Sequence, residues 1–242
     1  MENYIIRTIL MNILDMVKNN DIEGIKYLTN NNINYRDTIG MTPLHYAAGM
    51  KNTGIIKLLI DRGANVNAVD DIGCTPLHYA ALYHRTTETI RQLLESGADI
   101  NKADYIGSTP LHAAVFNEQN YEVIKLLIEN GANINAKNKG NNTALHYAAW
   151  NNTLDVVKLL IENGANINEK DIHGKTALFS AINNNDTAIV IYLLKNGADH
   201  EIKDKSGRTV LDYALEKENN ELINILSSRR YKNRDLNNDI GW

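Results

Sequence analysis

The sequence predicts an all-α protein in which pairs of helices stack into a solenoid and are joined by hairpin loops. Three observations predict this fold class. A helix-start motif recurs every 33 or 34 residues, at Thr42, Thr75, Thr109, Thr143, Thr176 and Thr209. A glycine marks a helix end in most intervals, and apolar residues at helical spacing lie between the two signals. A fixed period of this length indicates one supersecondary unit that is repeated and stacked.

The helix-start motif reads Thr-Pro-Leu-His-Tyr-Ala-Ala in its complete form, at residues 42–48 and 75–81. The Thr hydroxyl can accept a hydrogen bond from a free N–H group of the first turn, and Pro at the next position has no N–H to leave unpaired. The motif erodes at Thr176 and Thr209, where Phe179 and Asp212 replace the histidine. Each copy predicts the first helix of a unit. The second helix ends at Gly63, Gly97, Gly131, Gly164 and Gly197, because glycine tolerates the left-handed conformation that closes a helix.

These two signals resemble the ankyrin repeat in length and in the Thr-Pro-Leu-His-x-Ala signature. The resemblance covers five units from Asp37 to Lys203, with eroded units at both ends. It implies an ankyrin-repeat solenoid of stacked helix-turn-helix units with β-hairpin loops. It also implies a protein that binds other proteins.

We predict a single domain over residues 1–228 and a flexible tail at 229–242. The repeats occupy 37–69, 70–103, 104–137, 138–170 and 171–203, between an N-terminal cap at 1–36 and a C-terminal cap at 204–228. In the fourth repeat Asn141 replaces the glycine of the hairpin turn, so we expect that hairpin to be slightly displaced.

Composition and charge exclude several classes of function. The chain has 242 residues, of which 43% are hydrophobic and 22% charged, as in soluble globular proteins. Its net charge of -4 argues against a nucleic-acid partner. Arg7, Asn12 and Asp15 interrupt the apolar N-terminus, so we expect neither a signal peptide nor a membrane anchor. The single Cys74 cannot form an internal disulfide, which fits a cytoplasmic protein.

The recurring histidines are not expected to bind a metal. Stacked helices lie about 8–10 Å apart, whereas two nitrogens that share a zinc ion each approach it to about 2.0–2.1 Å. The resemblance instead implies that each ties its own turn to the neighbouring repeat: His45, His78, His112 and His146. Phe179 and Asp212 break the pattern, so we expect their units to close the turn in another way.

No catalytic residue or cofactor is predicted. Cys74 and His78 are four residues apart, but no third orienting group or electropositive pocket can be identified beside them. The chain also lacks a phosphate-binding glycine loop and a paired Cys-x-x-Cys motif.

The residues free to bind a partner lie at the hairpin tips and after the Ala pair, as the resemblance implies. Apolar side chains occupy several of these positions, and aromatic side chains dominate binding hot spots. The candidates are Ile39, Met41, Ile72, Tyr83, Tyr105, Ile106, Phe116 and Trp150. Ile39, Ile72, Ile106 and Ile172 recur in register, so packing between neighbouring hairpins is an equal alternative for them. The recurring Tyr46, Tyr79 and Tyr147 are assigned mainly to packing.

We therefore expect a monomeric, non-catalytic scaffold that binds a protein partner on its concave face. An alternative is a host-directed effector or regulator from a virus or intracellular bacterium, which the abundance of Asn, Ile and Lys suggests through an AT-rich genome. An enzyme would need a pocket with perturbed ionisable groups. The resemblance also implies that Asn67, Asn101, Asn135 and Asn168 are potential substrates of an asparaginyl oxygenase.

Overall fold

The structure, a computed structural model, describes residues 13–26, 33–50, 53–83, 87–117, 120–151 and 153–228. These ranges contain fourteen helices and no β-strand. None of these helices is long and apolar enough to cross a membrane. The predicted tail at 229–242 and most of the apolar N-terminus lie outside the described residues.

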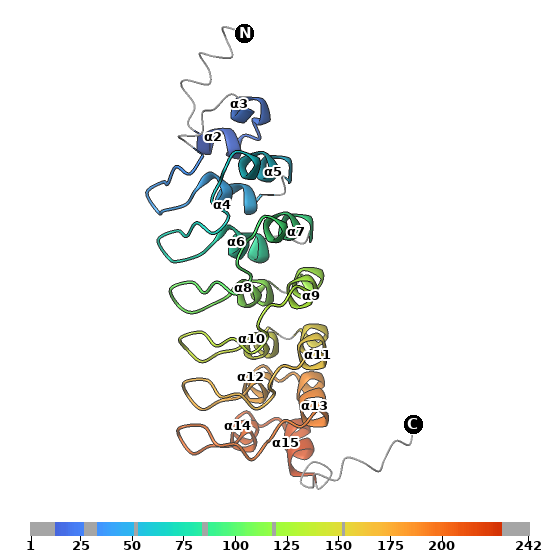
Figure 1. Cartoon of the computed structure of the whole chain (residues 1–242). Helices are drawn as coiled ribbons and strands as arrows, with labels where there is room; N and C mark the ends of the chain where they lie inside the picture. Colours follow the sequence, from blue (N-terminus) through green and yellow to red (C-terminus); the bar gives the residue numbers. More distant parts are fainter. Residues whose placement is uncertain are drawn as a thin grey trace. The chain divides into compact units, whose positions relative to one another are not determined.

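The chain divides into two compact units, residues 1–139 and 140–242. In the first unit each first helix is followed by an antiparallel second helix (Figure 1). The first helices α2, α4, α6 and α8 pack against one another in a row, and the second helices α3, α5, α7 and α9 form a parallel row. The pairs are α2 (Ile13–Lys18) with α3 (Ile22–Lys26), α4 (Pro43–Ala48) with α5 (Thr53–Asp61), α6 (Pro76–Tyr83) with α7 (Thr87–Glu95), and α8 (Pro110–Phe116) with α9 (Tyr121–Glu129).

The second unit repeats this arrangement with three helix pairs. First helices α10, α12 and α14 form one row, and second helices α11, α13 and α15 form the other (Figure 1). The pairs are α10 (Ala144–Trp150) with α11 (Leu154–Glu162), α12 (Ala177–Asn183) with α13 (Thr187–Lys195), and α14 (Val210–Glu216) with α15 (Asn220–Ser227).

The core of each unit is made by the motif residues that point between the helices. The leucine of the motif is buried in Leu44, Leu77 and Leu111, and the Ala pair at 80–81 is fully buried. Because Ala has a single methyl group, neighbouring first helices can approach closely at this position. Leu59 and Leu160 are fully buried from the second helices, as helical spacing predicts.

The hairpin loops are closed by an aspartate at their base. Asp37 Oδ1 accepts hydrogen bonds from the N–H groups of Ile39 at 3.0 Å and Met41 at 2.9 Å. Neighbouring tips are joined by one backbone bond, in which the N–H of Asp71 donates to the carbonyl of Ile39 at 3.1 Å. One bond between neighbours does not make a ladder, so the loops turn like hairpins without forming strands within the described residues.

The fourth hairpin keeps this geometry although it lacks the turn glycine. Asn141 adopts a φ of 56°, the left-handed conformation that Asn reaches more easily than most residues. The N–H of Ile172 donates to the carbonyl of Gly140 at 2.9 Å, as in the equivalent bonds of the other hairpins. The substitution therefore does not displace the tip from its register.

Asparagines that lie a few residues after the second helix of a repeat form hydrogen bonds to the next repeat. Asn67 donates from Nδ2 to the carbonyl of Gly97 at 2.9 Å and accepts at Oδ1 from the N–H of Asp99 at 2.7 Å. The same pair of bonds occurs at Asn34, Asn101 and Asn168. The sequence reading assigned no bridging role to these residues. The modification of Asn67, Asn101, Asn135 and Asn168 by an oxygenase stays a prediction.

Three of the motif histidines, His45, His78 and His146, tie their turn to the next hairpin, as expected. The Thr42 N–H donates to His45 Nδ1 at 3.0 Å, and the Thr42 hydroxyl lies 2.8 Å from the same atom. Because Nδ1 accepts from an N–H group, the ring proton belongs on Nε2, which donates to the carbonyl of Cys74 at 3.0 Å. His78 and His146 make the corresponding bonds to Ser108 at 3.0 Å and to Lys175 at 3.2 Å.

The two copies of the motif that lack the histidine, at Thr176 and Thr209, close the turn in different ways. Asp212 Oδ2 accepts from the Thr209 N–H at 2.7 Å and from its hydroxyl at 2.9 Å, so a carboxylate replaces the imidazole. Phe179 cannot do this and instead packs edge-to-face on Tyr213, with ring centroids 5.4 Å apart. The Thr176 hydroxyl is left buried without a hydrogen-bond partner. Of the two replacements, only Asp212 therefore makes the hydrogen bonds to the capping threonine that the histidine makes in the other repeats.

Replacing Thr176 with Val should leave the free energy of unfolding unchanged or raise it, because the lost hydroxyl has no partner. The matched change Thr143→Val removes the hydroxyl that lies 2.9 Å from His146 Nδ1 and should cost about 1 kcal/mol. Urea denaturation of both variants checks this. Equal destabilisation by the two changes would contradict the difference between the caps.

The buried histidines predict a loss of stability in mild acid. Burial lowers the pKa of His45, His78 and His146 below the usual 6.5, so the folded protein keeps them neutral where the unfolded chain binds protons. The contribution of these histidines to the free energy of unfolding is therefore fully present above pH 6.5. Below that pH it decreases by at most about 1.4 kcal/mol per pH unit for each histidine. Urea denaturation at about pH 7.5 and about pH 5.5 measures the loss. Equal or higher stability at the lower pH would refute it, and a proton NMR titration assigns the contribution of each ring.

Candidate protein-binding surface

The hairpin tips of the first unit carry exposed apolar side chains. Ile39, Ile72 and Ile106 are 54%, 62% and 61% exposed, and Tyr105 is 59% exposed. More than half of each isoleucine therefore faces solvent, so packing between neighbouring hairpins covers only the smaller part of it. We call these four residues the tip row.

Tyr105 is held in place by the preceding hairpin. A Cβ atom added to Gly73 would lie 2.6 Å from Tyr105 Cδ1, so the tyrosine ring covers the glycine directly. Gly73 also has a φ of 84°, which other residues rarely adopt. The N–H of Tyr105 donates to the carbonyl of Ile72 at 3.0 Å. The ring is thus fixed although most of it faces solvent.

A second exposed row lies at the other end of the first helices. Tyr83 and Phe116 are 57% and 64% exposed at the C-termini of α6 and α8. The Tyr83 ring stacks on that of Tyr79, with centroids 6.2 Å apart. At a helical rise of about 1.5 Å per residue, α6 is about 12 Å long, so Tyr83 lies at the end of the helix away from its hairpin. The two rows flank the exposed side of the first helices.

The tyrosines between the two rows bind the aspartates at the base of the hairpins. The hydroxyl of Tyr46 donates to Asp37 Oδ2 at 2.5 Å, and that of Tyr79 donates to Asp70 Oδ2 at 2.6 Å. The bond to Asp37 is the largest cause that raises the pKa of Tyr46 to about 12. The sequence reading missed this pairing. An Asp nine residues before the Tyr was the available signal, and it recurs at Asp204 and Tyr213.

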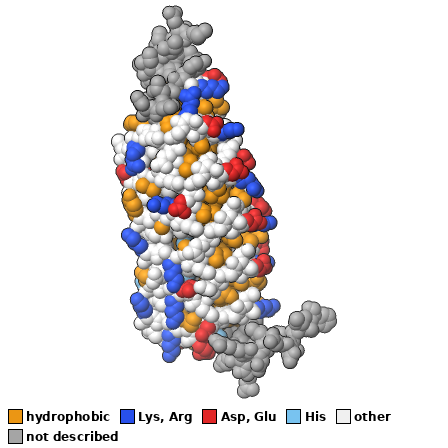
Figure 2. Space-filling view, in the orientation of Figure 1, with side chains coloured by type: hydrophobic (Ala, Val, Ile, Leu, Met, Phe, Trp, Pro, Cys, Tyr) orange, Lys and Arg blue, Asp and Glu red, His pale blue; other side chains and the backbone are white. Residues whose placement is uncertain are grey.

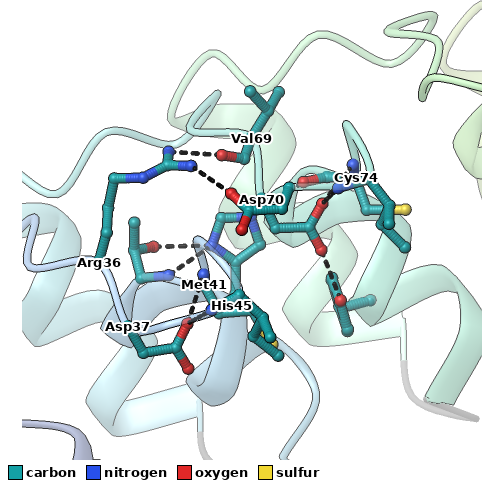
Figure 3. A network of polar contacts seen from close by, with 12 residues as sticks. Arg36, Asp37, Met41, His45, Val69, Asp70 and Cys74 are labelled. Atoms are coloured by element: carbon teal, nitrogen blue, oxygen red, sulfur yellow. Dashed lines mark hydrogen bonds and ion pairs between the residues drawn. The ribbon is translucent and has the colours of Figure 1, made fainter.

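Arg36 links the first two hairpins beside the tip row. Its guanidinium donates to the carbonyl of Val69 at 2.6 Å and lies 3.4 Å from Asp71 Oδ1 (Figure 3). Figure 3 also shows His45 and the two turn aspartates, Asp37 and Asp70, in the same polar network. The hairpin tips are therefore held by polar side chains at their base. The apolar side chains of Ile39 and Ile72 take no part in this polar network.

Met41 does not belong to this surface. It was predicted to be free for binding, but it is only 7% exposed. Its N–H is bound to Asp37 and its carbonyl accepts from the Asp37 N–H at 3.1 Å, so the closing turn carries its side chain inward. The prediction of an exposed Met41 is wrong.

The second unit exposes two of the predicted apolar side chains. Trp150, at the end of α10, is 56% exposed, and the side-chain amide of Asn184 donates to its carbonyl. Ile172 is 42% exposed at a hairpin tip. Among the described residues of this unit, Leu215 in α14 is the one other large apolar residue that is exposed.

Cys74 and His78 do not form a catalytic pair. The Cys74 thiol donates weakly to Asp104 Oδ2 at 3.9 Å, and both His78 nitrogens are engaged in the turn. Burial, followed by the charges of Asp70 and Asp104, raises the pKa of Cys74 to about 12. A thiol in this environment is a poor nucleophile. Within the described residues no group of His, Cys, Asp and Glu is arranged to hold a metal ion.

Cys74 should react with iodoacetamide at least about tenfold more slowly than a free cysteine peptide at the same mildly alkaline pH, because little thiolate forms. Since it is the only cysteine, mass spectrometry of the intact protein reports on it directly. The rate should recover when the protein is unfolded in urea. A folded-state rate equal to that of the peptide would contradict the raised pKa.

These features define an α-helical repeat protein in which the recurring motif residues build the fold and the hairpin tips are exposed. The family model described as ankyrin repeats, in three copies, matches residues 13–104, 104–171 and 169–238. The chain therefore belongs to the ankyrin repeat family.

The crystal structure of the ankyrin repeat domain of Bcl-3, described as a unique member of the IkappaB protein family, is similar to this chain. The TM-score is 0.78 at 31% sequence identity, and the match covers 90% of this chain and 98% of that one. No curated protein matches the chain significantly. The ankyrin repeat fold is generally a scaffold for protein–protein interaction, and its members are typically non-enzymatic.

Proposed function

We propose that this chain is a non-catalytic scaffold that binds a protein partner on its concave face. The observation that carries the proposal is the exposure, in one unit, of the tip row together with Tyr83 and Phe116. Large apolar side chains gathered on one surface mark interaction sites, and aromatic residues contribute most at binding hot spots. We propose that the scaffold acts as a monomer in the cytoplasm.

The surface is ordered before a partner arrives. Arg36 joins two hairpins, Tyr105 lies against Gly73, and the tyrosines of α4 and α6 are bound to turn aspartates. Binding therefore needs little loss of conformational freedom on this side, so more of the energy from burying apolar area remains as affinity. Burial yields about 25 cal/mol per Å² of apolar surface removed from water.

Replacing Tyr83, Tyr105, Phe116 and Trp150 with Ala should weaken capture of the partner from cell lysate at least about tenfold, since hot-spot truncations often cost 2 kcal/mol or more. Tyr121→Ala is the matched control, because this tyrosine is exposed on α9, in the row of second helices. Affinity capture with quantitative mass spectrometry compares the two variants with the parent chain.

A partner retained equally by the parent chain and the fourfold variant would refute the proposed surface. Circular dichroism melting of each variant separates lost binding from lost folding. The four side chains are mostly exposed, so the melting temperature should change little.

A further inference from the structure

Two successive hairpin loops of the second unit present cationic side chains to solvent. These are residues 170–175 and 203–208, which contribute Lys170, Lys175, Lys203, Lys205 and Arg208. Figure 2 shows Lys and Arg side chains gathered over the hairpin loops of this unit, with scattered acidic side chains among them. The N–H of Lys205 donates to the carbonyl of His173 at 2.9 Å, so the two loops form one surface. We call these five cations the cationic ridge.

The acidic side chains of the same loops are occupied by partners of their own. Asp171 Oδ1 accepts two N–H bonds within its loop, both at 2.8 Å. Asp204 is 7% exposed and accepts two N–H bonds, at 2.9 and 3.0 Å, and the hydroxyl of Tyr213 at 2.7 Å. These carboxylates serve the turns, and Asp204 also lies 3.8 Å from the Arg208 Nε. Hydrogen bonds from Thr209 and, to a smaller degree, the charge of Lys203 lower the pKa of Asp212, so Lys203 has one carboxylate in its vicinity.

The cations differ in how firmly they are held. Lys175 Nζ lies 4.8 Å from the centre of the Tyr213 ring and the Arg208 guanidinium lies 4.2 Å from it, so one ring fixes two charges. Arg208 also pairs with Glu216 at 3.1 Å. Lys170, Lys203 and Lys205 are exposed, and the described residues offer none of them a hydrogen bond or an ion pair. Three exposed lysines therefore share these two loops with a pair of cations held on the Tyr213 ring, of which Arg208 is paired with Glu216 and lies beside Asp204.

We propose that the cationic ridge binds an extended acidic segment of a protein partner. Neighbouring repeats stack about 8–10 Å apart, and an extended chain advances about 3.3 Å per residue. Carboxylates three residues apart along the segment therefore meet successive loops. The inference rests on the proposed function in that the partner is a protein, but it uses a different surface from the tip row.

A nucleic acid fits this ridge less well than an acidic peptide. Each strand carries one phosphate per 3.4 Å of helix axis, about three for every repeat. Glu169, Glu201 and Glu216 lie in or near these loops in the sequence and would repel closely spaced phosphates, and the whole chain carries a net charge of -4. A peptide can place neutral residues at those positions.

The test uses fluorescence anisotropy with labelled peptides of about ten residues in which Glu occupies every third position. This spaced peptide should bind more tightly than a peptide of the same composition with contiguous Glu, and its affinity should fall between about 50 mM and about 200 mM salt. Changing Lys170, Lys203 and Lys205 to Gln should weaken its binding at least about fivefold. Changing Lys57, Lys125 and Lys195 to Gln removes equal charge from exposed positions on second helices and should have no such effect.

Failure of the spaced peptide to bind would overturn the inference. Equal weakening by the two lysine variants, equal affinity for the contiguous peptide, or tighter binding of an oligothymidylate of the same charge would also overturn it. None of these outcomes bears on the tip row, whose test uses a captured partner and leaves the lysines intact. The two proposals therefore fail separately.

Discussion

The structure of each unit depends on hydrogen bonds that one repeat makes to the backbone of the next repeat in that unit. His45 donates to a carbonyl in the following hairpin, and Asn67 holds both a carbonyl and an N–H group after the following helix pair. Apolar burial drives the helices together but has no direction, so it does not by itself set the register between repeats. Directional hydrogen bonds to particular backbone groups of the neighbouring repeat set that register.

This arrangement separates the residues that hold the fold from those that can bind. The motif leucines, alanines and histidines are buried, and the turn aspartates bind amides and tyrosine hydroxyls. The hairpin tips are consequently free to vary. In the first unit they carry Ile72 and Tyr105, whereas in the second unit they carry His173 and Lys205. The same backbone turn therefore presents an apolar surface in one unit and a cationic surface in the other.

Sequence reasoning succeeded where a local rule decides the outcome. The helices begin directly after each motif threonine, and the histidines bridge to the next hairpin as the resemblance implied. It failed at Met41, because exposure was inferred from position in the repeat and the closing turn carries that side chain inward. It also missed the bond between Asp37 and Tyr46, because the eight residues between them include a turn and the start of a helix.

The sequence by itself determined the repeat, the helix starts and the family, because the capping residues and the 33- or 34-residue period act within one unit. Only the tertiary structure decided that Ile39 and Ile72 face solvent, that the Thr176 hydroxyl is left without a partner, and that Tyr213 gathers two cations. Each of these depends on where a neighbouring repeat places its side chains. That placement is set by packing between units, which no single stretch of the sequence encodes.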